Sequence, residues 1–300
     1  MPRTETARWC RDGEPTLGPD MSREITRRAV LAGAVTLPWL VACSPVVDQP
    51  TELDLNKPSG LDTGQPAGFG LEGGTFSSRF WPGREVRWRL ARPGHRATGT
   101  APQPLVVALH GRGANADWPF TAVHIERHVV STGLAVATVD GGTFYWHARR
   151  SGVDTGRMVI EELLPLLGSK GLATDRFGLI GWSMGGYGAL LMAARLGPGR
   201  VAGVVATSAA LWRSFGDTTA GAFDDREDFV RNDVFAARGA LRGIPVRLDC
   251  GRDDRFIEAN RAFARELPDA AVTFDEGAHT HAYFAAHAGA QMRWLRKHLQ

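Results

Sequence analysis

Cysteine is scarce in this sequence, and its scarcity excludes the sites that depend on it. Only three cysteines occur in 300 residues, at Cys10, Cys43 and Cys250. They form no Cys-x-x-Cys pair and no spacing typical of zinc ligands. We therefore expect no cysteine-based metal centre, and no motif in the sequence indicates a cofactor.

An excess of one charge is also lacking. The 35 basic residues nearly balance the 32 acidic ones, which leaves a net charge of +3. No long basic run interleaves with aromatic residues, so we expect no nucleic-acid partner. Hydrophobic residues make up 43% of the chain and charged residues 22%, a balance typical of a globular protein with a buried core.

The apolar segment near the N-terminus is too short to span a membrane. Residues 21–28 carry positive charge, and residues 29–42 are uncharged and mostly apolar. A membrane-spanning helix needs about 20 such residues, whereas a charged region followed by a short apolar region is typical of a signal peptide. We predict a leader with a signal peptide over residues 1–43. Met21 is an alternative start, because residues 1–20 resemble neither a signal nor a domain.

Two features of the leader indicate export from the cytoplasm. Arg27 and Arg28 are similar to a twin-arginine export signal, and the segment from Leu40 to Cys43 resembles the lipobox of bacterial lipoproteins. On this interpretation the Cys43 thiol is acylated, and the lipid is the protein's only contact with the membrane. Alternatively, Cys43 is an ordinary residue of the leader. We expect an exported protein, either a cell-envelope lipoprotein or a secreted one.

Residues 44–72 are rich in Pro, Gly, Asp and Thr and have no apolar periodicity, which predicts a flexible linker. Residues 73–300 then alternate strand patterns with helical patterns. This alternation predicts one α/β domain, with a mostly parallel central sheet and helices on both faces. Its ligand site should lie beyond the carboxyl ends of the strands.

The elements of this domain can be listed from their patterns. The predicted strands are residues 85–90, 105–109, 134–139, 177–180, 201–207, 244–248 and 271–274. The predicted helices are residues 158–167, 186–196, 258–267 and 282–299, the first of them interrupted by Pro165.

The most informative motif is Gly181-Trp-Ser-Met-Gly185, between a predicted strand and a predicted helix. Gly-x-Ser-x-Gly in this context holds a serine at the tip of a sharp turn, where glycine tolerates the close packing. The N-terminus of the following helix favours negative charge that develops there. The motif predicts Ser183 as a nucleophile. The alternative is a glycine-rich turn that only connects strand to helix.

A nucleophilic serine needs a histidine base, which follows it in the chain order of this motif. Four histidines follow closely enough to be candidates: His279, His281, His287 and His298. His279 is preferred because it follows a predicted strand and a turn, and the last two fall within the final helical pattern. A metal site on the His279-x-His281 pair is an alternative, but the local sequence supplies no third ligand.

The base in turn needs an orienting carboxylate. Asp249, Asp253 and Asp254 cluster where the predicted strand 244–248 ends. Asp249 is expected to belong to the strand, and we prefer Asp254 in the following turn. Asp253 is the alternative. The carboxylate that is not catalytic is expected to be a solvated turn residue paired with a neighbouring arginine.

Two backbone N–H groups should stabilise an oxyanion in such a site. One is expected from Met184, directly after the serine. The other should come from the glycine-rich loop after strand 105–109, at Arg112 or Gly113. His110 in this loop is expected to be structural.

The motifs together resemble the putative-esterase family of α/β-hydrolases, which includes S-formylglutathione hydrolase, secreted feruloyl and acetylxylan esterases, and the mycobacterial mycolyltransferases. The resemblance covers about residues 75–299, and its most specific run is Ser183-Met-Gly-Gly-Tyr-Gly-Ala189. It implies the α/β-hydrolase fold, with Asp254 as the catalytic carboxylate, His279 as the base and Arg112 as the second oxyanion donor. His281 departs from the family, many of whose members carry an aromatic residue there.

Three functions are consistent with these residues. The first is an exported serine esterase acting on small-molecule, carbohydrate or lipid esters through an acyl-enzyme on Ser183. The second is an acyltransferase that moves the acyl group to an envelope sugar or lipid. The third is a non-catalytic binding protein, against which the filled triad positions count.

The segment from residue 210 to 240 has the position of a cap over the site. Its aromatic residues could line an acyl pocket or only pack the cap: Trp212, Phe215, Phe223, Phe229 and Phe235. Tyr145 and Trp146 are further candidates for the pocket.

Overall fold

The computed structural model describes residues 68–94 and 101–300. The predicted leader, the alternative start at Met21 and the lipidation at Cys43 lie outside the described residues, as does the predicted linker up to residue 67. Among the described residues, no helix has the length and apolar character needed to cross a membrane.

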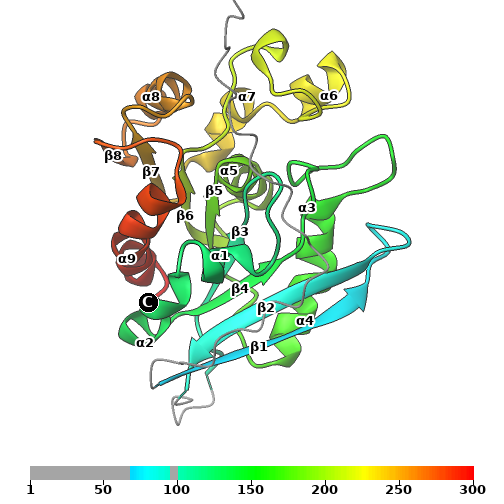
Figure 1. Ribbon diagram of the computed structural model, residues 1–300, viewed down its shortest axis with the longest axis vertical. Coiled ribbons are helices and arrows are strands. Elements are labelled where there is room, and N and C mark those ends of the chain that lie inside the picture. Colours follow the sequence, from blue (N-terminus) through cyan, green and yellow to red (C-terminus); the bar gives the residue numbers. More distant parts are fainter. Residues whose placement is uncertain (1–67, 95–100) are drawn as a thin grey trace, which may run out of the picture. The chain divides into compact units, whose positions relative to one another are not determined.

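An eight-stranded sheet forms the centre of the domain, in the order β1-β2-β4-β3-β5-β6-β7-β8 (Figure 1). The strands β3 to β8 are parallel, and β1 and β2 pair antiparallel at one edge. The bounds are β1 Phe69–Ser77, β2 Glu85–Pro93, β3 Leu105–Leu109, β4 Ala135–Val139, β5 Phe177–Trp182, β6 Val201–Thr207, β7 Val246–Gly251 and β8 Ala271–Asp275. The predicted fold class is therefore confirmed.

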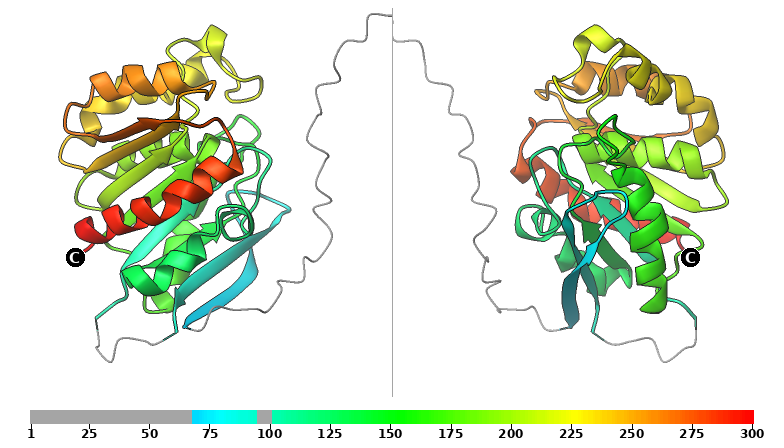
Figure 2. Two further views of the ribbon diagram at one scale, coloured as in Figure 1. Left: turned by 60° about the vertical axis from the view of Figure 1, so that its left-hand side comes forward. Right: turned by 90° about the vertical axis from the view of Figure 1, so that its right-hand side faces the viewer.

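Helices cover both faces of the sheet, because the central strands are apolar on both sides. Leu105, Val107 and Leu109 of β3 face one core, and Val106 and Ala108 face the other. The first core is covered by α3 Thr155–Met158, the π turn η2 Val159–Leu163, α4 Leu164–Ser169, α5 Met184–Leu196 and α8 Ile257–Arg265. The second is covered by α1 Trp118–Thr121, η1 Ile125–His128, α2 Val129–Thr132 and α9 His281–His298 (Figure 2).

The first strand, β1, was not predicted from the sequence pattern. β1 starts at Phe69, inside the segment 44–72 predicted as a linker, and pairs with β2 along its whole length. Three glycines in β1 hide the alternation that marks a strand. One of them is required by packing, since a Cβ on Gly73 would lie 2.7 Å from the Trp88 carbonyl oxygen.

The helical pattern interrupted by Pro165 is a continuous helical segment from Thr155 to Ser169. A proline has no N–H to donate to the preceding turn. The chain widens into the π turn η2 directly before Pro165, a local adjustment typical of such positions.

The segment between β6 and β7, where the sequence predicts a cap, folds into short helices and is called the cap below. It contains η3 Phe215–Asp217, α6 Arg226–Arg231, α7 Val234–Ala237 and η4 Arg238–Leu241. Four of its five candidate aromatic side chains are buried: Trp212, Phe223, Phe229 and Phe235. Phe223 packs against Phe229 and Phe235 against Phe263. These rings therefore pack both within the cap and between the cap and the rest of the domain.

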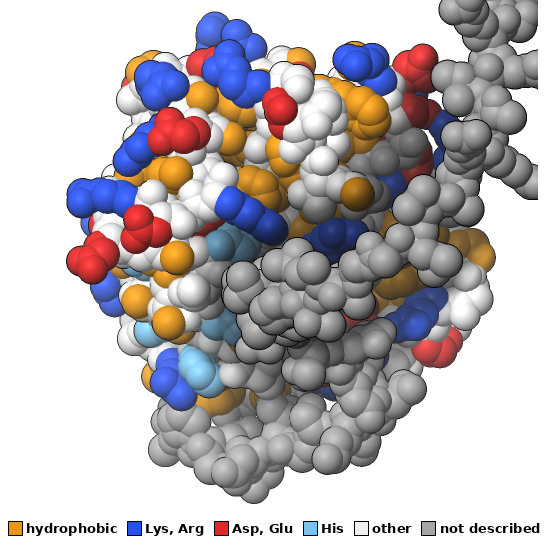
Figure 3. Space-filling model, turned by 45° about the horizontal axis from the view of Figure 1, so that its top comes forward, with side chains coloured by type: hydrophobic (Ala, Val, Ile, Leu, Met, Phe, Trp, Pro, Cys, Tyr) orange, Lys and Arg blue, Asp and Glu red, His pale blue; other side chains and the backbone are white. Residues whose placement is uncertain are grey.

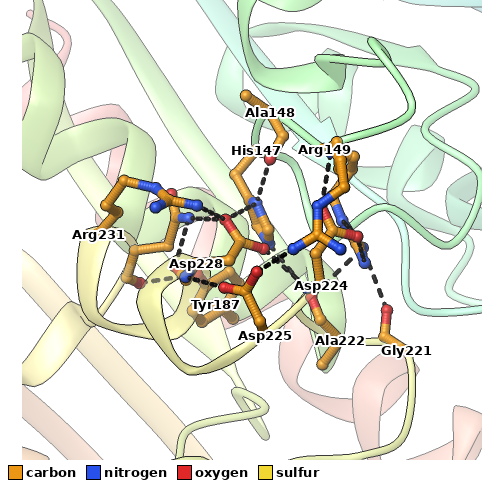
Figure 4. A network of polar contacts seen from close by, with 12 residues as sticks. His147, Ala148, Arg149, Tyr187, Gly221, Ala222, Asp224, Asp225, Asp228 and Arg231 are labelled. Carbon is orange, nitrogen blue, oxygen red and sulfur yellow. Dashed lines mark hydrogen bonds and ion pairs between the residues drawn. The ribbon is translucent and has the colours of Figure 1, made fainter.

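A polar network attaches this cap to the loop that follows β4 (Figure 4). The buried His147 ring stacks on Phe223, and its Nδ1 lies 3.8 Å from the Asp228 carboxylate. Arg149 pairs with Asp224 at 2.9 Å and donates to the Gly221 carbonyl at 3.1 Å. The charged groups of this part of the cap are thus used to hold it in place.

Candidate active site

Ser183 lies at the turn between β5 and α5 with backbone angles of φ 55° and ψ −117°. A non-glycine residue in such a conformation carries backbone strain of about 1–3 kcal/mol. Backbone hydrogen bonds hold it there: the Ser183 N–H donates to Thr207 O at 3.0 Å, and Ser183 O accepts from Tyr187 N at 3.1 Å and from Ala210 N at 3.0 Å. The side chain is thereby fixed at the carboxyl end of β5.

The two glycines of the motif allow this turn to pack closely. A Cβ on Gly181 would overlap the Gly185 carbonyl, and a Cβ on Gly185 would overlap the Leu109 carbonyl at the end of β3. Side chains at either position would push the serine away from its place. The motif is therefore a packing requirement of the fold as well as a sequence signature.

Asp254 and His279 come together beside the ends of β7 and β8. The His279 Nδ1 lies 2.8 Å from Asp254 Oδ2, and the Phe256 N–H donates to Asp254 Oδ1 at 2.9 Å. Burial alone would raise the pKa of the Asp254 carboxyl, but these hydrogen bonds hold that pKa below its usual value. The carboxylate is therefore kept ionised beside the imidazole, and it accepts a hydrogen bond from the Nδ1–H group of that ring.

The loops that carry these two side chains lie against each other. A Cβ on Gly251 would overlap the Gly277 carbonyl, and the Asp253 N–H donates to Gly277 O at 2.9 Å. The His279 ring is further held by edge contacts with Phe256 and Phe284, at centroid distances of 5.5 and 5.4 Å. His279 is thus oriented by packing on two sides.

The loop after β3 lies beside the serine. A Cβ on Gly111 would lie 3.6 Å from the Ser183 Cβ, so the backbone that leads to Arg112 passes the candidate nucleophile closely. Met184 is the first residue of α5. The two backbone N–H groups predicted for an oxyanion hole therefore belong to two segments that adjoin Ser183, the loop after β3 and the start of α5.

The arrangement of serine, imidazole and buried carboxylate at the ends of parallel strands is suited to attack on a carbonyl carbon. A family model described as "Putative esterase" matches residues 82–294. The chain belongs to this esterase family.

Solved structures show the same fold. An S-formylglutathione hydrolase from Agrobacterium tumefaciens is 20% identical with a TM-score of 0.68, and the alignment covers 79% of this chain and 98% of that one. The serine hydrolase FphF of Staphylococcus aureus is 18% identical with a TM-score of 0.67, covering 76% and 99%. A ferulic acid esterase is 18% identical with a TM-score of 0.65, covering 77% and 98%. These likenesses show that the esterase has the α/β-hydrolase fold. Among curated proteins none matches this chain.

The rival residues are placed elsewhere. Asp253 is exposed. His281 is exposed as well and accepts a hydrogen bond from Trp118 Nε1 at 3.3 Å, with the two rings packed edge to face. His287 pairs with Asp275 at 2.9 Å, and His298 packs on Trp294. Within residues 68–94 and 101–300, no three potential metal ligands come together, whether at the His279-x-His281 pair or elsewhere.

His110 holds the loop after β3, as predicted. It is buried; its Nδ1 lies 2.7 Å from Gly111 O, and its Nε2 accepts from the Gly141 N–H at 2.8 Å. Burial lowers the pKa of His110. The neutral tautomer with a proton on Nδ1 satisfies both contacts.

Asn260 of α8 is a supporting residue that the sequence interpretation missed. Its buried amide donates to Ala209 O and Phe256 O, both at 2.9 Å. The first bond fixes the segment whose Ala210 N–H holds Ser183, and the second fixes the residue that donates to Asp254. A polar residue on the apolar face of the helical pattern, between Ile257 and Phe263, was the available signal.

Tyr145 and Trp146 are both buried. Trp146 packs beneath the site against His110, at a centroid distance of 5.1 Å, and belongs to the core. Tyr145 contacts Trp212 and Tyr187, at 5.6 and 5.9 Å, and so lies between the core and the cap.

Proposed function

We propose that this chain is an exported serine esterase that hydrolyses carboxylic esters through an acyl-enzyme on Ser183. The observation that carries the proposal is the strained Ser183 turn together with the hydrogen-bonded pair of the buried Asp254 and the partly exposed His279. Each group lies after a strand of the same parallel sheet, where this fold binds its ligands.

The acylation step uses the three side chains in turn. Ser183 Oγ attacks the ester carbonyl carbon, and His279 Nε2 takes the hydroxyl proton, since Nδ1 is engaged with Asp254. Asp254 stabilises the imidazolium that forms. The tetrahedral intermediate then collapses, the bond to the alcohol oxygen breaks, and His279 returns the proton to the leaving alcohol.

The backbone N–H groups of Met184 and Arg112 bind the oxyanion in this proposal. The positive end of α5 adds to their effect, because developing negative charge lies at its N-terminus. Removing one such donor typically lowers kcat by about 10²–10³.

Deacylation repeats the chemistry with water. His279 takes a proton from water as the oxygen attacks the acyl carbon, and Ser183 leaves with that proton returned to its Oγ. The products are a carboxylic acid and regenerated enzyme. An acceptor alcohol in place of water would give an acyltransferase, and product analysis with sugar acceptors separates the two.

Covalent labelling tests the nucleophile. A fluorophosphonate probe should add to Ser183 with loss of fluoride, and peptide mass spectrometry should find the adduct on the peptide that contains Ser183. Asp254→Asn should slow the labelling because the imidazole loses its orienting carboxylate. An adduct on another residue, or no adduct in a folded protein, overturns the proposal.

Export rests on the leader alone. Expression of the full chain in a bacterial host with a twin-arginine pathway should give protein in the envelope fraction, labelled by a palmitate analogue at Cys43. Replacing Arg27 and Arg28 with lysine should retain the protein in the cytoplasm. Envelope delivery that persists in this variant contradicts the twin-arginine route.

A further inference from the structure

A cavity of about 600 Å³ lies next to the candidate triad. Its apolar wall includes Leu211, Trp212 and Phe256, and Trp212 and Phe256 are in edge contact at 5.9 Å. The Phe256 ring also contacts the His279 ring, so the cavity shares a wall with the candidate base. A substrate group bound here would be one aromatic ring away from the reaction.

The cavity has more basic than acidic side chains in its lining. Arg213, Arg255 and Arg265 line it, against Asp217 and Glu258. Glu258 pairs with Arg261 at 2.7 Å and Arg213 pairs with Glu266 at 3.9 Å, and neither of these two partners is part of the lining. Arg255 and Arg265 then stand against Asp217, so the remaining charge in the cavity is positive.

Arg255 has no acidic partner in the described part of the chain. Its guanidinium lies over the Phe256 ring, 4.8 Å from the centroid, and the side chain is exposed. Three arginines where the cap meets the loop after β4 behave differently, since they pair with acids: Arg149 with Asp224, Arg150 with Asp225 and Arg231 with Asp228. The first and the last of these pairs are labelled in Figure 4. Arg255 therefore presents an uncompensated cation beside the site.

A second guanidinium approaches from the opposite loop. Arg112 is exposed and, among the described residues, has no acidic partner; one of its nitrogens lies 3.7 Å from where a Cβ of Gly221 would stand. Burial raises the pKa of the Tyr145 hydroxyl, and the positive charges of Arg112 and Arg255 both act against that rise. Figure 3 shows basic side chains next to histidine side chains near the middle of the face of the molecule that it views.

We propose that the esters hydrolysed here carry a carboxylate, which Arg255 binds at the mouth of the cavity while Arg112 adds attraction from the opposite side. This inference rests on the proposed esterase function. The planar guanidinium presents two N–H groups that match the two carboxylate oxygens. The Phe256 ring contacts the Arg255 guanidinium, and no acidic side chain of the described residues occupies its N–H groups.

Two matched ester pairs test the proposal, one for each side of the ester bond. In the first, the charge is on the acyl group: the mono-4-nitrophenyl ester of adipic acid against 4-nitrophenyl hexanoate. In the second, it is on the leaving group: 4-acetoxybenzoate against its methyl ester. The wild-type chain should favour the charged member of at least one pair by about tenfold in kcat/KM, and that pair identifies the side that lies near Arg255.

Arg255→Gln should abolish this preference through a higher KM for the charged ester, while kcat/KM for the neutral ester stays within about twofold. The preference should also fall as salt is raised. Arg242→Gln is the matched control, because Arg242 is an exposed arginine before the start of β7, whereas Arg255 follows the end of that strand. This variant should leave kcat/KM unchanged for both the charged and the neutral ester.

Equal hydrolysis of both members of each pair overturns the carboxylate proposal, as does a preference that survives Arg255→Gln. In either case, neutral-ester hydrolysis that is lost in Ser183→Ala leaves the esterase function standing. If the folded chain hydrolyses none of the four esters, both proposals are wrong.

Discussion

At the scale of single residues, the 2.8 Å contact between Asp254 and His279 sets the tautomer and the orientation of the candidate base. An amide at position 254 would keep the shape and remove the charge. Asp254→Asn should therefore lower kcat for a 4-nitrophenyl ester by a factor on the order of 10⁴. Asp253→Asn changes an exposed neighbour and should stay within about twofold of wild type. Comparable losses in both variants would contradict the assignment.

The buried His110 predicts a pH dependence of stability. Its pKa in the folded protein is lowered by burial, so below about pH 6.5 the unfolded chain binds a proton that the folded chain does not. The contribution of His110 to stability is present above about pH 6.5 and is lost as the pH falls toward the folded pKa, by up to about 1.4 kcal/mol per pH unit.

His110→Gln removes this titration and keeps an acceptor for the Gly141 N–H. Urea unfolding at pH 7.5, 6.5 and 5.5 should show that the gap in unfolding free energy between wild type and variant narrows as the pH falls. Parallel pH profiles for the two proteins would show that His110 does not titrate in this way.

Residue types and spacing predicted Ser183, Asp254 and His279 as a set, because the chemistry needs those groups in that chain order. The sequence could not separate Asp254 from Asp253 on physical grounds, since both stand in the same turn. Burial separates them: the Asp254 side chain is 0% exposed, whereas Asp253 faces solvent. Burial of single turn residues depends on the packing of β8 against β7, which local sequence does not encode.

At the scale of secondary structure, the turn between β5 and α5 depends on its close approach to β3. A methyl group at Gly185 would overlap the Leu109 carbonyl, and backbone cannot move aside cheaply. Gly185→Ala should cost about 3 kcal/mol and lower the Tm by roughly 6–12 °C. Activity should fall with it, since Ser183 moves.

Gly199→Ala is the control for this substitution. It lies after the same helix, and a Cβ there would meet nothing within 4 Å. Differential scanning calorimetry should find its Tm within about 2 °C of wild type. A Gly185→Ala protein as stable as Gly199→Ala would show that the turn is looser than the packing indicates.

Strands and helices of the parallel part were predictable because continuous apolar runs and helical periods survive in the sequence. The strands β3 and β6 have the predicted bounds, and α9 differs by one residue at each end. β1 was missed because Gly70, Gly73 and Gly74 carry no side-chain pattern. Its place is fixed by pairing with β2, a contact between chain segments rather than a local preference.

At the scale of the whole molecule, β1 places residues 69–72, predicted as the end of a linker, in the central sheet. Phe69 and Leu71 pack against the core on the α9 side of the sheet. A chain that starts at residue 68 should keep the Tm and ester hydrolysis of the full chain. A chain that starts at residue 73 loses both side chains and should melt several degrees lower. Equal melting of the two truncated chains would contradict this boundary.

The central claim is that ester hydrolysis by this esterase passes through Ser183. The most direct measurement is kcat/KM for 4-nitrophenyl acetate in wild type and in Ser183→Ala, with circular dichroism to show that both are folded. Loss of the nucleophile should lower the rate by a factor on the order of 10⁶, to the background of the assay. A folded Ser183→Ala protein that hydrolyses the ester at a rate near wild type would contradict the account.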